Sequence, residues 1–101
     1  MSDAYQQAIR ESAENPLQFW GNAADAVDWF TPPEQVFDEQ RGWFAGGTLN
    51  TCYNAVDRHV AAGRGDAAAL IYDSPVTGTI GSYSYAQLRD EVGRVAAMLV
   101  R

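Results

Sequence analysis

Three pairs of adjacent aromatic residues constrain the fold of this chain most strongly: Phe19-Trp20, Trp29-Phe30 and Trp43-Phe44. Side chains of neighbouring residues point about 100° apart on a helix and in opposite directions on a strand. The six rings therefore cannot all face one small interior, although core packing is the first expectation for each ring taken singly. A chain of 101 residues provides about one small domain. Together, the pairs indicate that some rings pack against a body outside these residues.

The charge balance is acidic and argues against two classes of binding protein. Thirteen acidic residues against seven basic ones give a net charge of -6 and an isoelectric point near 4.4. Binding to nucleic acid or to an anionic membrane needs a basic face. No apolar run approaches the roughly 20 residues of a membrane helix, and the start, MSDAYQQAIRE, lacks the layout of a signal peptide. We therefore expect no nucleic-acid partner and no membrane partner.

Cysteine and lysine usage narrows the chemistry further. Cys52 is the single cysteine, which excludes an internal disulfide and fits a reducing compartment, so the predicted location is the cytoplasm. All seven basic residues are arginines, and the chain has no lysine. Chemistry that uses a lysine ammonium group, such as adenylation, cannot be completed by this chain alone.

The first third of the chain is divided into short elements by capping residues. Asp3 can cap a helix that runs to about Glu14. The run Asn15-Pro16-Leu17-Gln18 places a cap, a proline and a glutamine at the start of a second short helix. Thr31-Pro32-Pro33-Glu34 repeats this arrangement before Val36 and Phe37, which predicts a third short helix.

Local signals are clearer in the second half. Gly46-Gly47 breaks the backbone, and Asn50 or Thr48 can cap a helix over residues 51–62 that ends at Gly63. On that helix one apolar stripe is predicted, with a buried cysteine: Cys52, Val56, His59 and Val60.

A hairpin and a helix follow. Residues 67–72 (AAALIY) predict a buried strand, and residues 79–83 return as the second strand. Ser84-Tyr85-Ala86-Gln87 is a capping box that starts a helix with an apolar stripe and an Asp90–Arg94 pair. No glycine, asparagine or proline ends this helix, so we expect the sequence to be a piece cut from a longer chain.

Cys52, Asp57 and His59 are the candidates for a catalytic or metal site. On a helix, Cys52 and His59 share a face but are separated by about 10 Å of rise. A zinc ion needs its ligands within roughly 2.0–2.3 Å of one point, and a nucleophile pair needs hydrogen-bond contact. Asp57 and His59 fall on nearly opposite sides of the helix. We therefore predict scaffold here, and a small hydrolase using Cys52 or His59 is the least favoured alternative.

Two further motifs are interpreted as structural. Arg64-Gly65-Asp66 spells a cell-adhesion tripeptide, but the preceding helix and following strand favour a helix stop and a turn. Gly63 and Gly65 form no phosphate cradle, because a strand follows them instead of a helix N-terminus. We therefore assign no catalytic, cofactor-binding or metal-ligating residue to this chain.

Several segments together resemble a known family. Residues 43–50 (WFAGGTLN), 53–54 (YN) and 57–60 (DRHV) resemble the N-terminal segment of acetyl- and propionyl-CoA synthetases, which are acyl-adenylate-forming ligases. Residues 69–78 (ALIYDSPVTG) resemble the propionyl-CoA synthetase branch, and residues 83–88 (YSYAQL) resemble the start of the AMP-binding domain. The opening segment of the family is also matched, by Tyr5, Phe19-Trp20 and Trp29.

The resemblance implies a parent enzyme that makes propionyl-CoA from propionate, ATP and coenzyme A through an acyl-adenylate, with Mg²⁺. It implies an α+β fold: a mainly helical segment, one β-hairpin and a C-terminal helix. Residues 1–65 would be the N-terminal extension, and residues 66–101 the incomplete start of the AMP-binding domain. The phosphate loop, acyl pocket and catalytic lysine would lie downstream, so the isolated chain is expected to be inactive. The partner would be the remainder of the ligase; the alternative is a self-associating interaction module, simplest as a homodimer.

Overall fold

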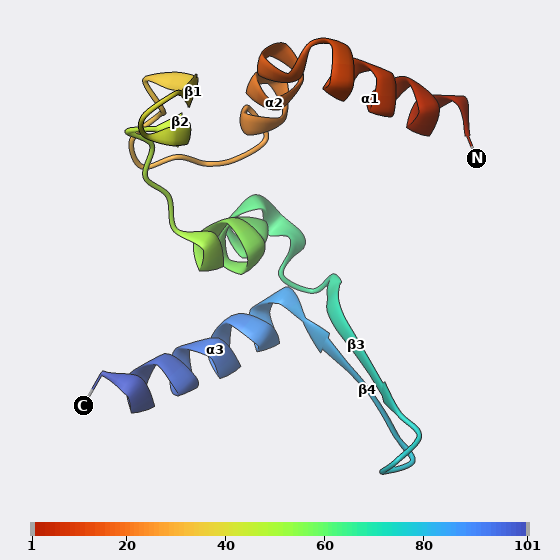
Figure 1. Ribbon diagram of the computed structural model, residues 1–101. Helices are drawn as coiled ribbons and strands as arrows, with labels where there is room; N and C mark the ends of the chain where they lie inside the picture. Colours follow the sequence, from red (N-terminus) through yellow and green to blue (C-terminus); the bar gives the residue numbers. More distant parts are fainter. Residues whose placement is uncertain (1, 101) are drawn as a thin grey trace. The chain divides into compact units, whose positions relative to one another are not determined.

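Two helices and a short hairpin make up the first half of the chain (Figure 1). The computed structural model describes residues 2–100. It divides into unit 1, Met1–Asn50, and unit 2, Thr51–Arg101. Each unit is described by itself.

Helices α1 (Asp3–Glu14) and α2 (Pro16–Ala24) confirm the first two predicted helices. The N-cap of α1 is Ser2 and not Asp3, which lies in the first turn, where a carboxylate also favours the helix dipole. Asn15 and Pro16 separate the helices as predicted, with the proline at the first position of α2. Asn15 makes no side-chain capping hydrogen bond, so the proline carries the local signal.

The predicted third helix is wrong, because the chain forms a hairpin there. Strand β1 (Gln35–Asp38) pairs antiparallel with β2 (Gly42–Ala45), and Phe37 lies opposite Trp43. The backbone N–H of Glu34 donates to the carbonyl of Ala45 at 2.9 Å. The backbone groups of this segment thus find partners across the hairpin instead of four residues back.

Aromatic rings connect α2 to this hairpin. The ring of Trp43 lies 5.0 Å from that of Phe37 and 6.4 Å from that of Trp20, centroid to centroid. Trp29 contacts Phe44 at 5.8 Å, and its indole N–H donates to the carbonyl of Ala24. Phe30 is exposed. The rings stabilise one another, and the prediction that some also pack on an outside body stays a prediction.

Unit 2 opens with a helical segment over residues 51–64, close to the predicted 51–62. Most of it has the wide turns of a π-helix, in η1 (Tyr53–Asp57) and η2 (Val60–Arg64). Gly63 has φ of 82°, which ends the regular helix as predicted. The side chain of Val56 is buried.

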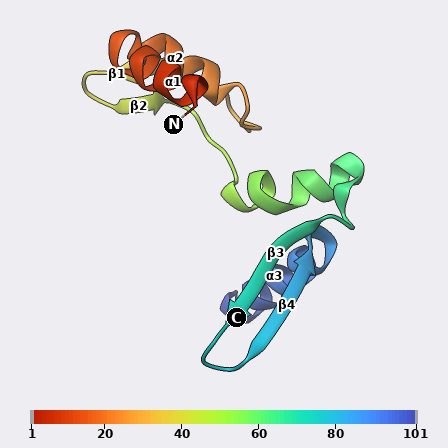
Figure 2. The same cartoon turned by 90° about the vertical axis from the view of Figure 1, so that its right-hand side faces the viewer.

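The predicted second hairpin is confirmed. Strands β3 (Ala68–Ser74) and β4 (Thr79–Ser84) pair antiparallel, with Leu70 opposite Tyr83 (Figure 2). The prediction that the first strand is buried is wrong: Ile71 is 73% exposed, and Ile80 on β4 is 75% exposed. A two-stranded sheet has two faces, and α3 is the element of unit 2 that contacts this sheet.

Helix α3 (Tyr85–Leu99) starts with the predicted capping box. The hydroxyl of Ser84 accepts from the backbone N–H of Gln87, and the Gln87 side chain accepts from the backbone N–H of Ser84. The predicted Asp90–Arg94 pair is replaced by two others. Arg94 Nη1 donates to Glu91 Oε1 at 2.6 Å, and Arg89 lies 3.6 Å from Asp90.

These elements confirm the α+β class, with two hairpins where one was expected. Among the described residues, the side chains of Ala45 and Val56 are the two that are buried. No helix within residues 2–100 combines the length and apolar character needed to cross a membrane. The compact units divide after Asn50, and the predicted family-domain boundary at residue 65 stays a prediction.

Candidate functional site

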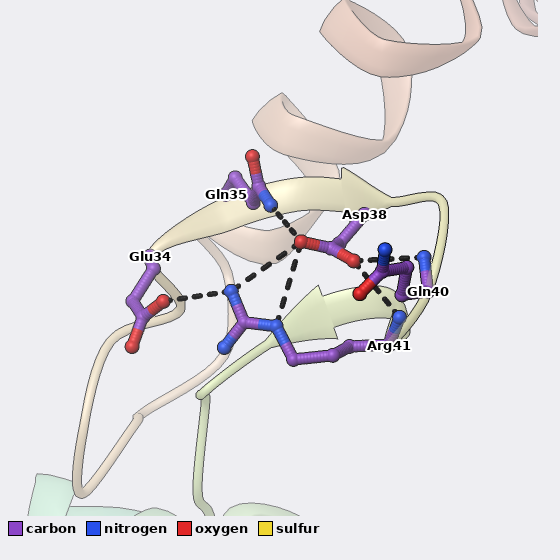
Figure 3. Close-up of polar contacts among 5 residues, drawn as sticks. All are labelled: Glu34, Gln35, Asp38, Gln40 and Arg41. Carbon is purple, nitrogen blue, oxygen red and sulfur yellow. Dashed lines mark hydrogen bonds and ion pairs between the residues drawn. The ribbon is translucent and has the colours of Figure 1, made fainter.

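A polar cluster centred on Arg41 closes the β1–β2 hairpin (Figure 3). Arg41 Nη2 donates to Glu34 Oε2 at 2.9 Å and lies 3.4 Å from Asp38 Oδ2. Asp38 Oδ1 accepts from the backbone N–H groups of Gln40 and Arg41, both at 2.9 Å. Gln35 Nε2 donates to Asp38 Oδ2 at 2.5 Å. We call these five residues the Arg41 cluster.

The pKa of the Asp38 carboxyl is lowered by hydrogen bonds that stabilise its ionised form. The backbone N–H of Arg41 has the largest effect, followed by that of Gln40, and the Arg41 charge adds to it. In turn, Glu34 and then Asp38 raise the pKa of Arg41. Glu34 and Asp38 therefore act as hydrogen-bond acceptors that hold the turn. This arrangement offers no free acid or base for catalysis.

Glu34 also lies close to Gly46, the first residue of the glycine pair. A Cβ atom at Gly46, whose φ is 77°, would lie 2.9 Å from Glu34 Oε1. A Cβ atom at Gly47 would lie 2.9 Å from the ring of Trp29 and 3.1 Å from the carbonyl oxygen of Phe44. The glycine pair thus permits a turn and a close approach, as predicted for scaffold.

The wide turns of the helical segment bring together residues five apart. Cys52 Sγ lies 3.7 Å from Asp57 Oδ2. Arg64 Nη2 contacts His59 Nδ1, and these two residues are also five apart in the sequence. An α-helix pairs residues three and four apart, so a prediction based on α-helical spacing missed both contacts.

Cys52 and His59 have different partners. The ring of His59 lies 4.8 Å from that of Tyr85, the first residue of α3. Arg64 Nη2 contacts the same ring, at His59 Nδ1. The imidazole is thus engaged with Tyr85 and Arg64, and it is not the base of a Cys–His pair.

Cys52 is exposed, so the prediction of a buried cysteine is wrong. It precedes the first wide turn, and its thiol faces Asp57 instead of the stripe that Val56 occupies. Partial desolvation and the negative charge of Asp57 raise the pKa of the thiol. Since the thiolate is the nucleophile, these surroundings make Cys52 less reactive.

The remaining motif residues form the predicted turn. The backbone carbonyl of Gly65 accepts from the N–H of Ala86 at 3.0 Å, and that of Arg64 accepts from the N–H of Ala67. Arg64-Gly65-Asp66 thus joins η2 to β3. Within residues 2–100, no three histidine, cysteine or acidic side chains are grouped so that they could hold a metal ion.

A comparison with known protein families identifies the first half of the chain. Residues 5–55, just over half of the chain, match the family model described as "Acetyl-coenzyme A synthetase N-terminus". The chain belongs to this family. The matched range of this acetyl-coenzyme A synthetase N-terminus includes the Arg41 cluster, the glycine pair and most of η1.

Individual relatives cover nearly the whole chain. The human "Acyl-CoA synthetase short-chain family member 3, mitochondrial" is 40% identical over 101 residues, which is 96% of this chain and 15% of the relative. An uncharacterized protein of Pseudomonas aeruginosa is 48% identical over 98 residues, 93% of this chain and 15% of the relative. The "Acetyl-coenzyme A synthetase" of Mycobacterium bovis is 37% identical over 102 residues, 97% of this chain and 16% of the relative. The chain thus spans only about 15% of the length of these relatives.

Proposed function

We propose that this chain is the N-terminal part of an ATP-dependent propionate–CoA ligase. The enzyme would convert propionate, ATP and coenzyme A to propionyl-CoA, AMP and pyrophosphate, with Mg²⁺. The match of residues 5–55 to the acetyl-coenzyme A synthetase N-terminus carries the ligase assignment. The resemblance of residues 69–78 to the propionyl-CoA synthetase branch supports the choice of propionate, as does the similarity to a relative named as a short-chain synthetase.

A hollow of about 630 Å³ beside α1 and α2 does not fit ATP or coenzyme A. A triphosphate needs cationic groups and backbone donors; the chain has no lysine, and none of its seven arginines lines this hollow. The lining residues of the hollow are Glu11, Asn15, Gln18, Phe19, Asn22 and Ala23. We therefore assign no nucleotide or coenzyme A contact to these residues and propose that the remainder of the ligase supplies the catalytic groups.

Steady-state kinetics of the full-length protein test this function. Propionate, acetate and butyrate are compared with ATP, Mg²⁺ and coenzyme A, and pyrophosphate release is followed. We expect the highest kcat/KM for propionate. A clear preference for acetate would reject propionate as the substrate but would still agree with the family assignment. Absence of acyl-CoA with every acid, or a gene that ends at Arg101, would reject the ligase.

The isolated chain provides the complementary test. With ATP, propionate and hydroxylamine it is expected to form no acyl-hydroxamate, and clear turnover would place catalytic groups within these 101 residues. The alternative of a self-associating module without catalysis gains no support from the family match. Cytoplasmic localisation remains a proposal, to be tested by fractionation of the native host.

A further inference from the structure

An apolar surface extends along α3 and onto the β3–β4 hairpin of unit 2. Two neighbouring hollows, of about 380 and 370 Å³, share Glu91 as a lining residue. The first lies beside the hairpin and the second along the C-terminal half of α3. We define the α3 face by six of the lining residues: Leu70, Tyr72, Tyr83, Leu88, Val95 and Leu99.

Only one end of this face is partly covered. Leu88 and Val92 are half-buried, because the first half of α3 contacts the hairpin. Val95 and Leu99 continue the same stripe, but they are 55% and 80% exposed. An amphipathic helix is stabilised mainly by burying its apolar stripe, so the exposed half lacks a covering element.

The charge distribution of unit 2 favours an apolar partner for the α3 face. Unit 1 holds eight carboxylates and two arginines and carries the whole net charge of -6, whereas unit 2 holds five carboxylates and five arginines. On the α3 face, Glu91 is neutralised by Arg94 at 2.6 Å. A neutral, apolar surface gains free energy mainly by burial and offers little attraction for a charged ligand.

The chain as a whole has more accessible surface than compact bodies of its mass would have. The chain exposes 7789 Å². Even two independent compact bodies of half this mass would together expose only about 6,800 Å² by the usual scaling of area with mass. The excess of roughly 1,000 Å² belongs to the whole chain, and the exposed side chains of the α3 face, such as Val95 and Leu99, contribute part of it.

We infer that the α3 face is the docking surface for the remainder of the ligase, which seats an apolar element on it. This inference rests on the proposed function, because the matched family is an enzyme N-terminus and the relatives are more than six times longer. A continuing chain would be tethered at the end of α3, next to Leu99. Tethering gives it an effective concentration of about millimolar, well above that of a separate partner.

Hydrogen exchange of the full-length protein tests this surface without relying on activity. We expect amides of α3 to exchange at least about tenfold more slowly in the full-length protein than in the 101-residue chain, with the isolated chain diluted until it is monomeric. Val95→Glu in the full-length protein should remove much of that protection. Val76→Glu is the matched control, because Val76 is 93% exposed and lies in the β3–β4 turn outside the face.

The outcomes separate the surface from the function. If α3 exchanges equally fast in both proteins while the full-length protein makes propionyl-CoA, the docking surface is wrong and the ligase stands. Protection of α3 in the full-length protein that rises with protein concentration would identify a second copy as the occupant and overturn the inference. If α3 is protected at every concentration but no acyl-CoA forms, the surface stands and the proposed function fails. If Val95→Glu prevents folding, the exchange rates of α3 in the wild-type full-length protein and in the 101-residue chain still test the docking surface.

Discussion

The contact between Cys52 and Asp57 shows how backbone geometry sets the chemistry of a single residue. In an α-helix, residues five apart diverge around the axis, whereas the wider π turn aligns them. The thiol therefore faces a carboxylate, which opposes formation of the thiolate. A reactive cysteine needs the opposite surroundings, with positive charge nearby.

Asp57→Asn is expected to make Cys52 more reactive. Removing the negative charge lowers the pKa of the thiol, so more thiolate is present at a given pH. The rate of alkylation by iodoacetamide, measured across the alkaline range, reports this change. Asp66→Asn is the matched control, because it removes one carboxylate elsewhere in unit 2. Equal rates in the two variants would contradict the proposed coupling.

The Arg41 cluster predicts a pH dependence at Asp38. Because the folded-state pKa is below the ordinary value of 3.8, ionised Asp38 stabilises the hairpin at neutral pH. This contribution is complete above the unfolded-state pKa and is lost below about pH 4, as pH falls through the folded-state pKa. Titration of the Asp38 carboxyl carbon by NMR should give a midpoint below 3.8.

Arg41→Gln separates the causes of this shift. The backbone N–H groups of Gln40 and Arg41 have the largest effects and survive the substitution, while the guanidinium charge is removed. The midpoint should therefore rise but stay below the ordinary value. A complete return to that value would show that the charge, and not the backbone, is the main cause.

At the level of elements, local signals predicted most helices and missed one hairpin. The capping box at Ser84 and the Asn15-Pro16 break act within four residues, so the sequence alone located α2 and α3. Residues 31–37 have equally good local signals for a helix. Their strand partner, β2, lies beyond the turn at residues 39–41, and this non-local pairing overrides the local preference.

The candidate site was predictable only in part. The scaffold role of the glycine pair and the turn at Gly65 follow from residue type and spacing. The π turns do not, because the same residues are compatible with an α-helix, and the contacts of Cys52 and His59 depend on that difference. The Arg41 cluster was also missed, because it requires the hairpin.

Alanine at two glycines should give opposite changes in stability. Gly47→Ala would press a methyl group against Trp29 and the Phe44 carbonyl, so we expect a loss of about 1–3 kcal/mol. Gly93 lies within α3 with no atom within 4 Å of the added Cβ, so Gly93→Ala should gain about 0.5–1 kcal/mol. Denaturation followed by tryptophan fluorescence reports on Gly47→Ala, since all three tryptophans lie in unit 1. Circular dichroism reports on Gly93→Ala. An unchanged or increased stability of Gly47→Ala would contradict the close approach at Gly47.

At the level of the whole molecule, little of the chain is buried for its size. Ala45 and Val56 are the two buried side chains among the described residues, while many large apolar side chains stay exposed. Small chains bury a limited share of their surface in any case. The excess area described for this chain goes beyond that limit, and exposed aromatic side chains such as Phe30 and Trp43 are part of it.

Self-association is therefore expected when the chain is produced alone. Its sedimentation coefficient should rise with concentration, because a second copy can cover apolar surface that nothing else covers. Val95→Glu should weaken this association, whereas Val76→Glu should leave it unchanged. A strictly monomeric species at high concentration would contradict the expectation.

The β3–β4 hairpin has a consequence for protein synthesis. Both outer strand edges of a two-stranded sheet present unpaired backbone groups, and Ile71 and Ile80 add exposed apolar surface. If the chain is the N-terminal part of a ligase of the relatives' length, as proposed, about 85% of the polypeptide would still have to be translated when this hairpin leaves the ribosome. At about 5–20 residues per second, that takes on the order of a minute. Throughout this interval the nascent chain would expose unpaired strand edges next to apolar side chains, and we expect ribosome-associated chaperones to bind it there.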